Sequence, residues 1–236
     1  MNTPNLTPRL KTIYDMVENC GVFSDIGTDH AYLPVALAIE GKCQRAIASD
    51  IAKGPLMRAK DTVLKYRISD KVELRLGAGL DSLQKNEADV ICIAGMGGLM
   101  IADILKNGED KLGFAKSIIL QPMSSVPDLR FFLNENGYVI ERELLAKEEE
   151  KIYNIMSVSI SDKKNRRILS DAELLAGREL IAERPEFFDE YIDRLILKTE
   201  KIIKGLENSN NLGNEISLKQ KVLSDLYKIK MGENNV

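Results

Sequence analysis

Short apolar runs alternate with amphipathic segments of helical periodicity along the first two thirds of the chain. The apolar runs have the length and residue types of buried strands, and we expect strands at Val22–Ile26, Arg45–Ser49, Val72–Leu76, Val90–Ala94, Ser117–Gln121, Tyr138–Leu145 and Ile152–Ser159. The helical patterns fall at Tyr32–Glu40, Pro55–Tyr66, Leu99–Asn107 and Val126–Asn136, and an earlier helix is expected to begin at Thr7–Pro8. This alternation predicts an α/β fold whose mostly parallel, seven-stranded sheet is covered on both faces.

The last two predicted strands are separated only by the charged stretch Lys147–Lys151. A parallel connection needs a crossover of a dozen or more residues, so these strands should form an antiparallel hairpin at the edge of the sheet. Seven strands that end in a hairpin are the pattern of Rossmann-like class I methyltransferases.

The pattern changes after Ser161, where a basic linker is followed only by helical or loop-like sequence. We therefore expect two domains, residues 1–161 and residues 162–236. A first apolar stripe alternates spacings of four and three, as in a coiled coil, at Phe188, Ile192, Leu195, Thr199, Ile202 and Leu206. The Asn-rich stretch Glu207–Asn214 reads as a loop, and the facing stripe is expected at Leu218, Val222, Leu226 and Ile229. These patterns predict a C-terminal coiled-coil hairpin.

Composition narrows the function only slightly. The chain has 236 residues, 44% of them hydrophobic, and a net charge of −3, so it can bury a core but shows no overall basic signal for nucleic acid. No N-terminal stretch resembles a signal peptide and no apolar run is long enough to cross a bilayer. Cys20, Cys43 and Cys92 lack metal-ligand spacing and indicate small buried hydrophobes. We expect a cytoplasmic protein without a membrane or metal partner.

The first chemical motif is FSDIGTDHAYLP, Phe23 to Pro34, where a predicted strand ends on Asp25 and turns at Gly27. A glycine there lets a ligand approach the backbone closely. Dinucleotide sites usually carry several glycines for a pyrophosphate, whereas Gly27 is flanked by the carboxylates of Asp25 and Asp29. Carboxylates repel a pyrophosphate but suit the ammonium and sulfonium of S-adenosylmethionine. The alternative is that Asp25 merely caps a turn.

Three further strand ends carry features of the same kind. Asp50 follows Gly27 by 23 positions, where an acid would bind the hydroxyls of an adenosine ribose, although a turn-capping role is equally compatible. The glycine-rich turns Gly77–Leu80 and Ala94–Gly98 end the next two strands. Parallel strands end at one edge of a sheet, so these features are expected to meet in one crevice.

The motifs DIGTDHAYLP, ASDIAKGPLMRAK, RLGAGL, IAGMGG and LQPM occur in one order along the chain. In order and spacing they resemble the bacterial tRNA adenine-N1 methyltransferases that act on position 22, the TrmK family, and the resemblance covers the whole chain. It implies S-adenosylmethionine-dependent methylation of N1 of adenine 22 in tRNA, with the coiled-coil appendage helping to hold the tRNA.

The resemblance also implies a set of cofactor ligands. Position by position, these are Asp25, Gly27, Thr28, Asp29 and His30 in the first loop, Asp50 and Ile51 at the ribose, Gly77, Ala78 and Gly79 at the adenine, and Ala94, Gly95 and Met96 beside the sulfonium. The chain departs from the family at three positions, because the family often has Glu at Asp50, Asp at Ala78 and Asn at Met123. The last departure replaces an amide by a thioether in a region expected to contact the target base.

The catalytic set is predicted to be Asp29, His30, Gln121 and Tyr153. Methyl transfer moves positive charge onto the adenine ring, and we expect Asp29 to stabilise that charge or to take a proton, with His30 orienting it. The alternative is that Asp29 only holds the amino group of the cofactor.

The target base must be extruded from its stack, and the predicted platforms for it are Tyr32, Met96, Met123 and Tyr153. Contacts to tRNA phosphates are expected from Lys198, Lys201 and Lys204, with further lysines on the second helix of the hairpin.

Two other functions remain open from the sequence. The same fold could methylate a small molecule or a protein, with the hairpin serving dimerisation. A non-catalytic module that senses S-adenosylmethionine or binds RNA is also compatible with Ala78 and Met123. The oligomeric state and the choice of tRNAs are left open.

Overall fold

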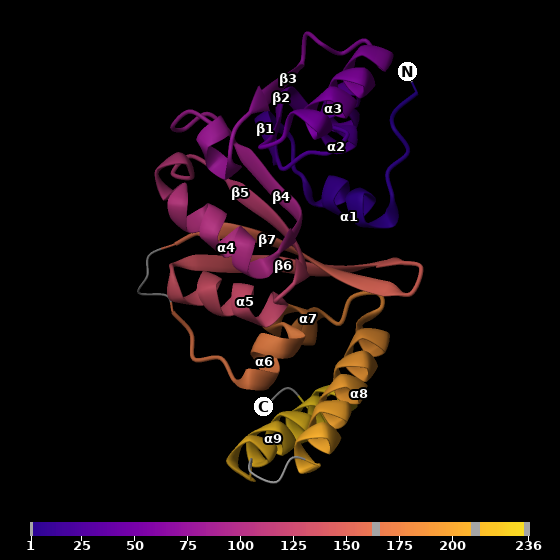
Figure 1. Ribbon diagram of the computed structural model, residues 1–236, viewed down its shortest axis with the longest axis vertical. Helices are drawn as coiled ribbons and strands as arrows, with labels where there is room; N and C mark the ends of the chain where they lie inside the picture. Colours follow the sequence, from indigo (N-terminus) through magenta and orange to yellow (C-terminus); the bar gives the residue numbers. More distant parts are fainter. Residues whose placement is uncertain (1, 162–165, 209–212, 234–236) are drawn as a thin grey trace.

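A single sheet of seven strands organises the molecule, in the order β3-β2-β1-β4-β5-β7-β6 (Figure 1). The computed structural model describes residues 2–161, 166–208 and 213–233. The strands are β1 (Cys20–Ile26), β2 (Cys43–Asp50), β3 (Val72–Leu76), β4 (Val90–Gly97), β5 (Ser117–Ser124), β6 (Tyr138–Glu148) and β7 (Lys151–Ile160). Strands β1 to β5 pair in parallel, and β7 pairs antiparallel with both β5 and β6. The mostly parallel sheet with an edge hairpin is therefore confirmed.

Helices cover both faces of this sheet. They are α1 (Pro8–Met16), α2 (Tyr32–Ile39), α3 (Lys53–Lys65), α4 (Gly98–Asn107) and α5 (Val126–Glu135), with short 3-10 turns η1 (Gly79–Ser82) and η2 (Glu109–Lys111). The residues of α1, α2 and α3 share one buried cluster, and those of α4 and α5 share another on the opposite face. This is the three-layer arrangement that the alternation of strands and helices predicts.

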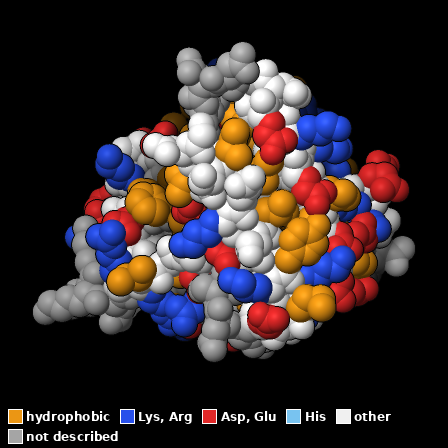
Figure 2. Space-filling model, turned by 90° about the horizontal axis from the view of Figure 1, so that it is seen from below, with side chains coloured by type: hydrophobic (Ala, Val, Ile, Leu, Met, Phe, Trp, Pro, Cys, Tyr) orange, Lys and Arg blue, Asp and Glu red, His pale blue; other side chains and the backbone are white. Residues whose placement is uncertain are grey.

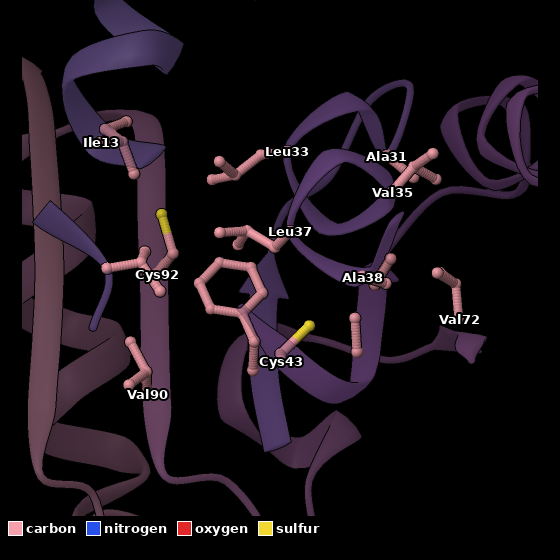
Figure 3. Packing of buried hydrophobic residues seen from close by; sticks show 14 of the residues in the cluster. Ile13, Ala31, Leu33, Val35, Leu37, Ala38, Cys43, Val72, Val90 and Cys92 are labelled. Carbon is pink, nitrogen blue, oxygen red and sulfur yellow. The ribbon is translucent and has the colours of Figure 1, made fainter. Parts of the chain in front are cut away.

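The two faces of β4 show how the sequence builds the core. Val90 and Cys92 pack with α1, α2 and α3, while the alternate residues Ile91 and Ile93 pack with α4 and α5. Figure 3 shows Val90 and Cys92 beside the side chains that α2 contributes. Cys43 and Cys92 are buried as predicted, and burial raises the pKa of the Cys43 thiol to about 12.

Several strands are longer than predicted. β4 continues through Gly97 and β5 through Ser124, and the pairing Gly97↔Ser124 follows register shifts after Ala94. The extension brings the two backbones together, since a Cβ on Gly98 would lie 2.3 Å from the carbonyl oxygen of Ser125. The predicted glycine-rich loop at Ala94–Gly98 is thus mostly irregular strand.

The edge hairpin also absorbs most of the charged stretch Lys147–Lys151. Only residues 149–150 form its turn, and Glu149 there has a φ of 52°. The tip is tied to helix α8 (Phe188–Glu207), because Lys147 pairs with Glu190 at 2.8 Å and Arg194 donates to the Glu150 carbonyl.

Four helices follow the sheet: α6 (Asp171–Ala176), α7 (Arg178–Glu183), α8 (Phe188–Glu207) and α9 (Gly213–Met231). Figure 1 shows α8 and α9 side by side at the end of the molecule farthest from α3. Cross-helix contacts from Tyr227 to Glu200 and from Lys230 to Asp193 show that the two helices are antiparallel. The predicted helical hairpin is present.

The predicted seam of the hairpin is wrong near the connection between α8 and α9, where different residues are buried. Ile202 is 39% exposed and Leu218 59% exposed, whereas Ile203 is buried. A straight helix has 3.6 residues per turn and drifts from a strict heptad pattern, which moves the buried stripe by one position. Leu206 is half-buried, while Val222, Leu226 and Ile229 are buried as predicted.

The C-terminal helices pack directly on the sheet. Leu145 of β6 belongs to the buried cluster of α6 to α9, and the buried guanidinium of Arg130 bonds to Glu143 and to the carbonyl oxygens of Leu174 and Leu175. We call this contact the junction. Lys163 and Lys164 of the predicted linker lie outside the described residues, and the division at residue 161 stays a prediction.

Candidate active site

A crevice of about 340 Å³ opens at the carboxyl ends of β1 and β4. Its lining comes from the start of α1, the β1–α2 loop and the end of β4: Thr7, Arg9, Leu10, Asp25, Gly27, Thr28, Asp29, His30, Ala31, Tyr32, Leu33, Ala94 and Gly95. The structure thus brings together all five residues of the first predicted cofactor loop and two of the three predicted beside the sulfonium.

The backbone at Gly27 leaves no room for a side chain. Its φ is 78°, and a Cβ built on it would lie 2.0 Å from Cε of Met96. Any larger residue would therefore be strained and would displace Met96. The side chain of Met96 fills this space, and the close approach of a ligand to the backbone at Gly27 stays a prediction.

Asp25 is a buried acid one residue before the end of β1. Burial raises the pKa of its carboxyl to about 6, and Thr28 and the charge of Arg9 oppose the rise. Within the described residues, no Lys or Arg forms an ion pair with Asp25 and no backbone N–H donates to its carboxylate. The bond to the Thr28 side chain ties Asp25 to the following turn, so the turn-capping alternative stays open, and Arg9 acts on this buried acid only through its charge.

Asp50 and the glycines after β3 lie farther along the same edge. The Asp50 carboxylate accepts the backbone N–H of Ala52 at 2.7 Å, so the turn-capping alternative does describe part of its role. Its own carbonyl accepts the N–H of Gly77 at 3.0 Å, which places the loop of Gly77, Ala78 and Gly79 beside it. Ile51 is 73% exposed next to them.

Asp29 and His30 lie at the rim of the crevice. One Asp29 oxygen accepts from Nε and Nη2 of Arg58, and the other lies 3.3 Å from Nε2 of His30. The rings of His30 and Tyr32 are stacked, with centroids 5.0 Å apart and planes inclined by 6°. The sequence did not reveal Arg58 as the partner of Asp29.

Gln121 is fully buried, and both ends of its amide are used inside the protein. Its oxygen accepts from Nη1 of Arg9 at 2.6 Å and from the Gly95 N–H at 3.1 Å. Its nitrogen donates to the Pro122 carbonyl at 2.9 Å and contacts the sulfur of Met123 at 3.6 Å. Gln121 therefore positions its neighbours, and in this arrangement it has no group left for a substrate.

Arg9 is the main residue that the sequence analysis missed. Besides bonding Gln121, its guanidinium lies 5.6 Å from the ring centre of Tyr153, and its Nε is buried without a hydrogen-bond partner among the described residues. The backbone N–H of Arg9 donates to Glu148 at 2.9 Å. The only available signal was its place in the first turn of a predicted helix, and nothing in the pattern linked it to Gln121.

Comparison with known proteins assigns this arrangement to a family. The family model described as "TrmK: tRNA (adenine(22)-N(1))-methyltransferase" matches residues 23–228. The chain belongs to the TrmK family. The predicted family is confirmed, and with it the methyltransferase class and the use of S-adenosylmethionine.

Individual relatives agree with this assignment. The tRNA (adenine(22)-N(1))-methyltransferase of Bacillus subtilis is 39% identical over 163 residues, which are 69% of this chain and 68% of the relative. The crystal structure of B. subtilis TrmK superposes with a TM-score of 0.83 at 31% identity, covering 97% of this chain and 99% of that one. A putative Streptococcus pneumoniae tRNA (m1A22) methyltransferase in complex with S-adenosyl-L-methionine gives 0.80 at 31% identity, over 93% and 100%.

The four residues predicted as base platforms in this TrmK family member differ in their position relative to the crevice. Tyr32 lines it and is 39% exposed. Met96 covers Gly27, and Met123 is 47% exposed at the end of β5. Tyr153 is half-buried beside Arg9 and packs on the core. Tyr32 thus has the most suitable position for a flat ligand.

The lysines predicted to contact tRNA lie far from the crevice. Lys198, Lys201 and Lys204 are exposed on α8, and none forms an ion pair with another described residue. On α9, by contrast, Lys228 pairs with Asp225 and Lys230 with Asp193. Figure 2, which views the molecule from the end that carries α8 and α9, shows positive and negative side chains interspersed over this face.

Neither a metal cluster nor a membrane-spanning helix is found in the part of the chain that the structure describes. There, no group of three or more His, Cys, Asp or Glu side chains is arranged to hold a metal ion. None of the helices in the same residues combines the length and the apolar composition that crossing a bilayer requires.

Proposed function

We propose that this protein transfers a methyl group from S-adenosylmethionine to N1 of adenine 22 in tRNA. The observation that carries the proposal is the buried carboxylate of Asp25 beside Gly27, which forms no ion pair with a described Lys or Arg, in a chain whose family model bears that activity. A tRNA substrate places the protein in the cytoplasm.

The donor set of the crevice fits the cofactor. The Asp25 carboxylate is buried and forms no ion pair with a described Lys or Arg, which suits an ammonium group. The Asp50 carboxylate is oriented by its bond to Ala52 and would accept from ribose hydroxyls. When bound, S-adenosylmethionine supplies the electrophilic methyl group.

The side chains at the rim would act on the adenine. N1 is itself a nucleophile, so alignment is the main requirement. Asp29 is held by Arg58 and His30, which would fix its carboxylate where positive charge develops on the base. Tyr32 would stack on the extruded adenine. In this proposal Asp29 acts as a fixed charge, and His30 orients it.

Arg9 and Gln121 would set the geometry of the inner wall. Their hydrogen bonds link the start of α1 to Gly95 of β4 and to Pro122 of β5. We assign both as positioning residues, because the Gln121 amide is fully used within the protein and Arg9 is one of its partners. Tyr153 supports the guanidinium of Arg9 from the side.

The test is incubation with tritium-methyl S-adenosylmethionine and total tRNA. We expect label in tRNA and a reverse-transcription stop at adenine 22, because a methyl group on N1 blocks base pairing. A transcript with guanosine at position 22 is the matched control and should take up no label. Label in a protein or small molecule would support the first alternative function, and no label despite cofactor binding would support a non-catalytic module.

A further inference from the structure

A second hollow of about 270 Å³ adjoins the crevice. His30 and Tyr32 line both spaces, so they form a shared wall. The remaining lining comes from one face of α3, at Arg58, Asp61, Thr62, Lys65 and Tyr66. Figure 1 shows α3 near the end of the molecule opposite α8 and α9, so the predicted phosphate contacts on α8 do not reach this hollow.

Aromatic side chains line much of the second hollow. The stacked rings of His30 and Tyr32 are parallel to within 6°, and Tyr66 contributes another aromatic ring at the end of α3. Proteins that bind single-stranded nucleic acid use such rings as stacking platforms for unpaired bases.

The charges around the hollow are balanced. Arg58 is paired with Asp29, and the ammonium of Lys65 lies 5.4 Å from the ring centre of Tyr66. Asp61 adds a second carboxylate that, among the described residues, forms no ion pair. Two cations and two anions produce no net attraction for a phosphate, so the hollow suits an uncharged planar group. The Asp61 carboxylate would accept from the exocyclic amine of a base.

We propose that this hollow seats the base of the nucleotide next to the target adenine, and that it favours a base with an exocyclic amine. The inference rests on the proposed function. Extruding the target disrupts its stack, which frees a neighbouring base, and the shared wall of His30 and Tyr32 places that neighbour directly beside the target. Stacking on Tyr66 and acceptance by Asp61 replace the contacts that the neighbour loses.

The first experiment compares Tyr66→Ala with Tyr66→Phe, which keeps the ring. Loss of a stacking platform costs about 1–3 kcal/mol per base, or roughly a 5- to 150-fold decrease in kcat/KM for tRNA. We expect this decrease in Tyr66→Ala, near wild-type values in Tyr66→Phe, and unchanged affinity of both variants for S-adenosylmethionine by calorimetry. A weakened cofactor affinity would overturn the inference, because the hollow would then belong to the cofactor site.

A cycle of protein and substrate changes makes the test specific. Transcripts carry an abasic residue on either side of the target adenine, and each is assayed with wild type and Tyr66→Ala. If Tyr66 stacks on one of the two neighbouring bases, removing that base should lower kcat/KM for the wild-type enzyme. The same abasic transcript and intact tRNA should then give equal kcat/KM with Tyr66→Ala, because the variant has already lost the contact. Independent losses on both sides would overturn the inference.

Asp61→Asn covers the case in which Tyr66→Ala does not fold, because Asp61 is exposed. This variant should change the preference between cytidine and uridine at the same neighbouring position, and an unchanged preference would refute the role of Asp61. The two proposals are separable. A wild type that labels tRNA while Tyr66 and Asp61 have no effect removes only this inference, whereas a wild type that fails to label tRNA removes both.

Discussion

Two buried carboxylates, Asp25 on the interior strand β1 and Glu143 on the edge strand β6, have different partners within the chain. Glu143 at the junction is 0% exposed and accepts from Arg130 at 2.6 Å and from Asn154 at 3.1 Å. Asp25 in the crevice is buried to a similar degree, but no described Lys or Arg forms an ion pair with it, and the pKa of its carboxyl is raised to about 6.

The difference in pairing indicates a structural role for Glu143 and a binding role for Asp25. A buried charge is costly unless it is paired, and the junction satisfies this requirement within the chain. In the crevice, Thr28 and the charge of Arg9 offset the cost of burying Asp25 only in part, so a bound cation would stabilise its charge further. Perturbed acids of this kind concentrate at binding and catalytic sites, and the contrast predicts opposite consequences of mutating each region.

The largest effect is expected at the junction. Arg130→Met would leave Glu143 buried without its partner and should lower the free energy of unfolding by about 3–5 kcal/mol, measured by urea denaturation. The control is Arg166→Met, which breaks an exposed pair with Glu135 and should cost about 1 kcal/mol or less. Equal losses in the two variants would contradict the contrast.

Replacing the unpaired acid should stabilise the ligand-free protein and impair binding. The pKa of Asp25 is raised from 3.8 to about 6 in the folded state, so its ionised form opposes folding by about 3 kcal/mol above pH 6. Asp25→Asn should remove this cost and raise Tm at pH 8. Its affinity for S-adenosylmethionine should fall roughly 10- to 100-fold, as expected for loss of a charge-assisted hydrogen bond.

The pH dependence follows from the direction of the same shift. Below pH 4 the carboxyl is protonated in both folded and unfolded chains, so the stability gain of Asp25→Asn should disappear as pH falls from 6 toward 4. Wild-type cofactor affinity should decrease as pH drops below about 6, whereas that of the variant should stay flat. A pH-independent gain in Tm would assign the effect to packing.

A smaller effect is expected from the positioning pair. Arg9→Met removes a charge-assisted bond to Gln121, worth about 1.5 kcal/mol, and should reduce kcat about tenfold while the Kd for S-adenosylmethionine changes less. Lys11→Met, on the exposed side of the same helix, is the control. A variant that lost cofactor binding but kept kcat would place Arg9 in the cofactor site instead.

Local patterns explain what the sequence predicted well. Strand ends, Gly27 and Asp25 could be found because a strand, its turn and the following helix are contiguous, and parallel strands bring their ends together. The edge hairpin was predictable from the length of its connection. These features depend on neighbouring residues in the chain.

Contacts between distant segments were not predictable in the same way. Arg9 and Gln121 are 112 positions apart and Asp29 and Arg58 are 29 apart, and hydropathy does not encode which cation meets which acceptor. The prediction of the hairpin seam failed for a different reason. Ile202 and Ile203 are both apolar, and only the actual helical pitch decides which of them is buried.

The hairpin itself provides the smallest expected effect and extends the contrast to the surface. Lys198, Lys201 and Lys204 have no acidic partner among the described residues, whereas Lys228 and Lys230 are paired. Replacing the first three by Ala should reduce the slope of log K for tRNA against log salt by about 2–3, measured by filter binding, with cofactor affinity unchanged. The paired control, Lys228→Ala with Lys230→Ala, should alter the slope less, because Asp225 and Asp193 already neutralise these charges. Equal changes in slope for the α8 and α9 variants would show that unpaired lysines do not mark the tRNA-binding face. The inference that an unpaired charge marks a binding site, drawn from Asp25 and Glu143, would then apply only to the protein interior.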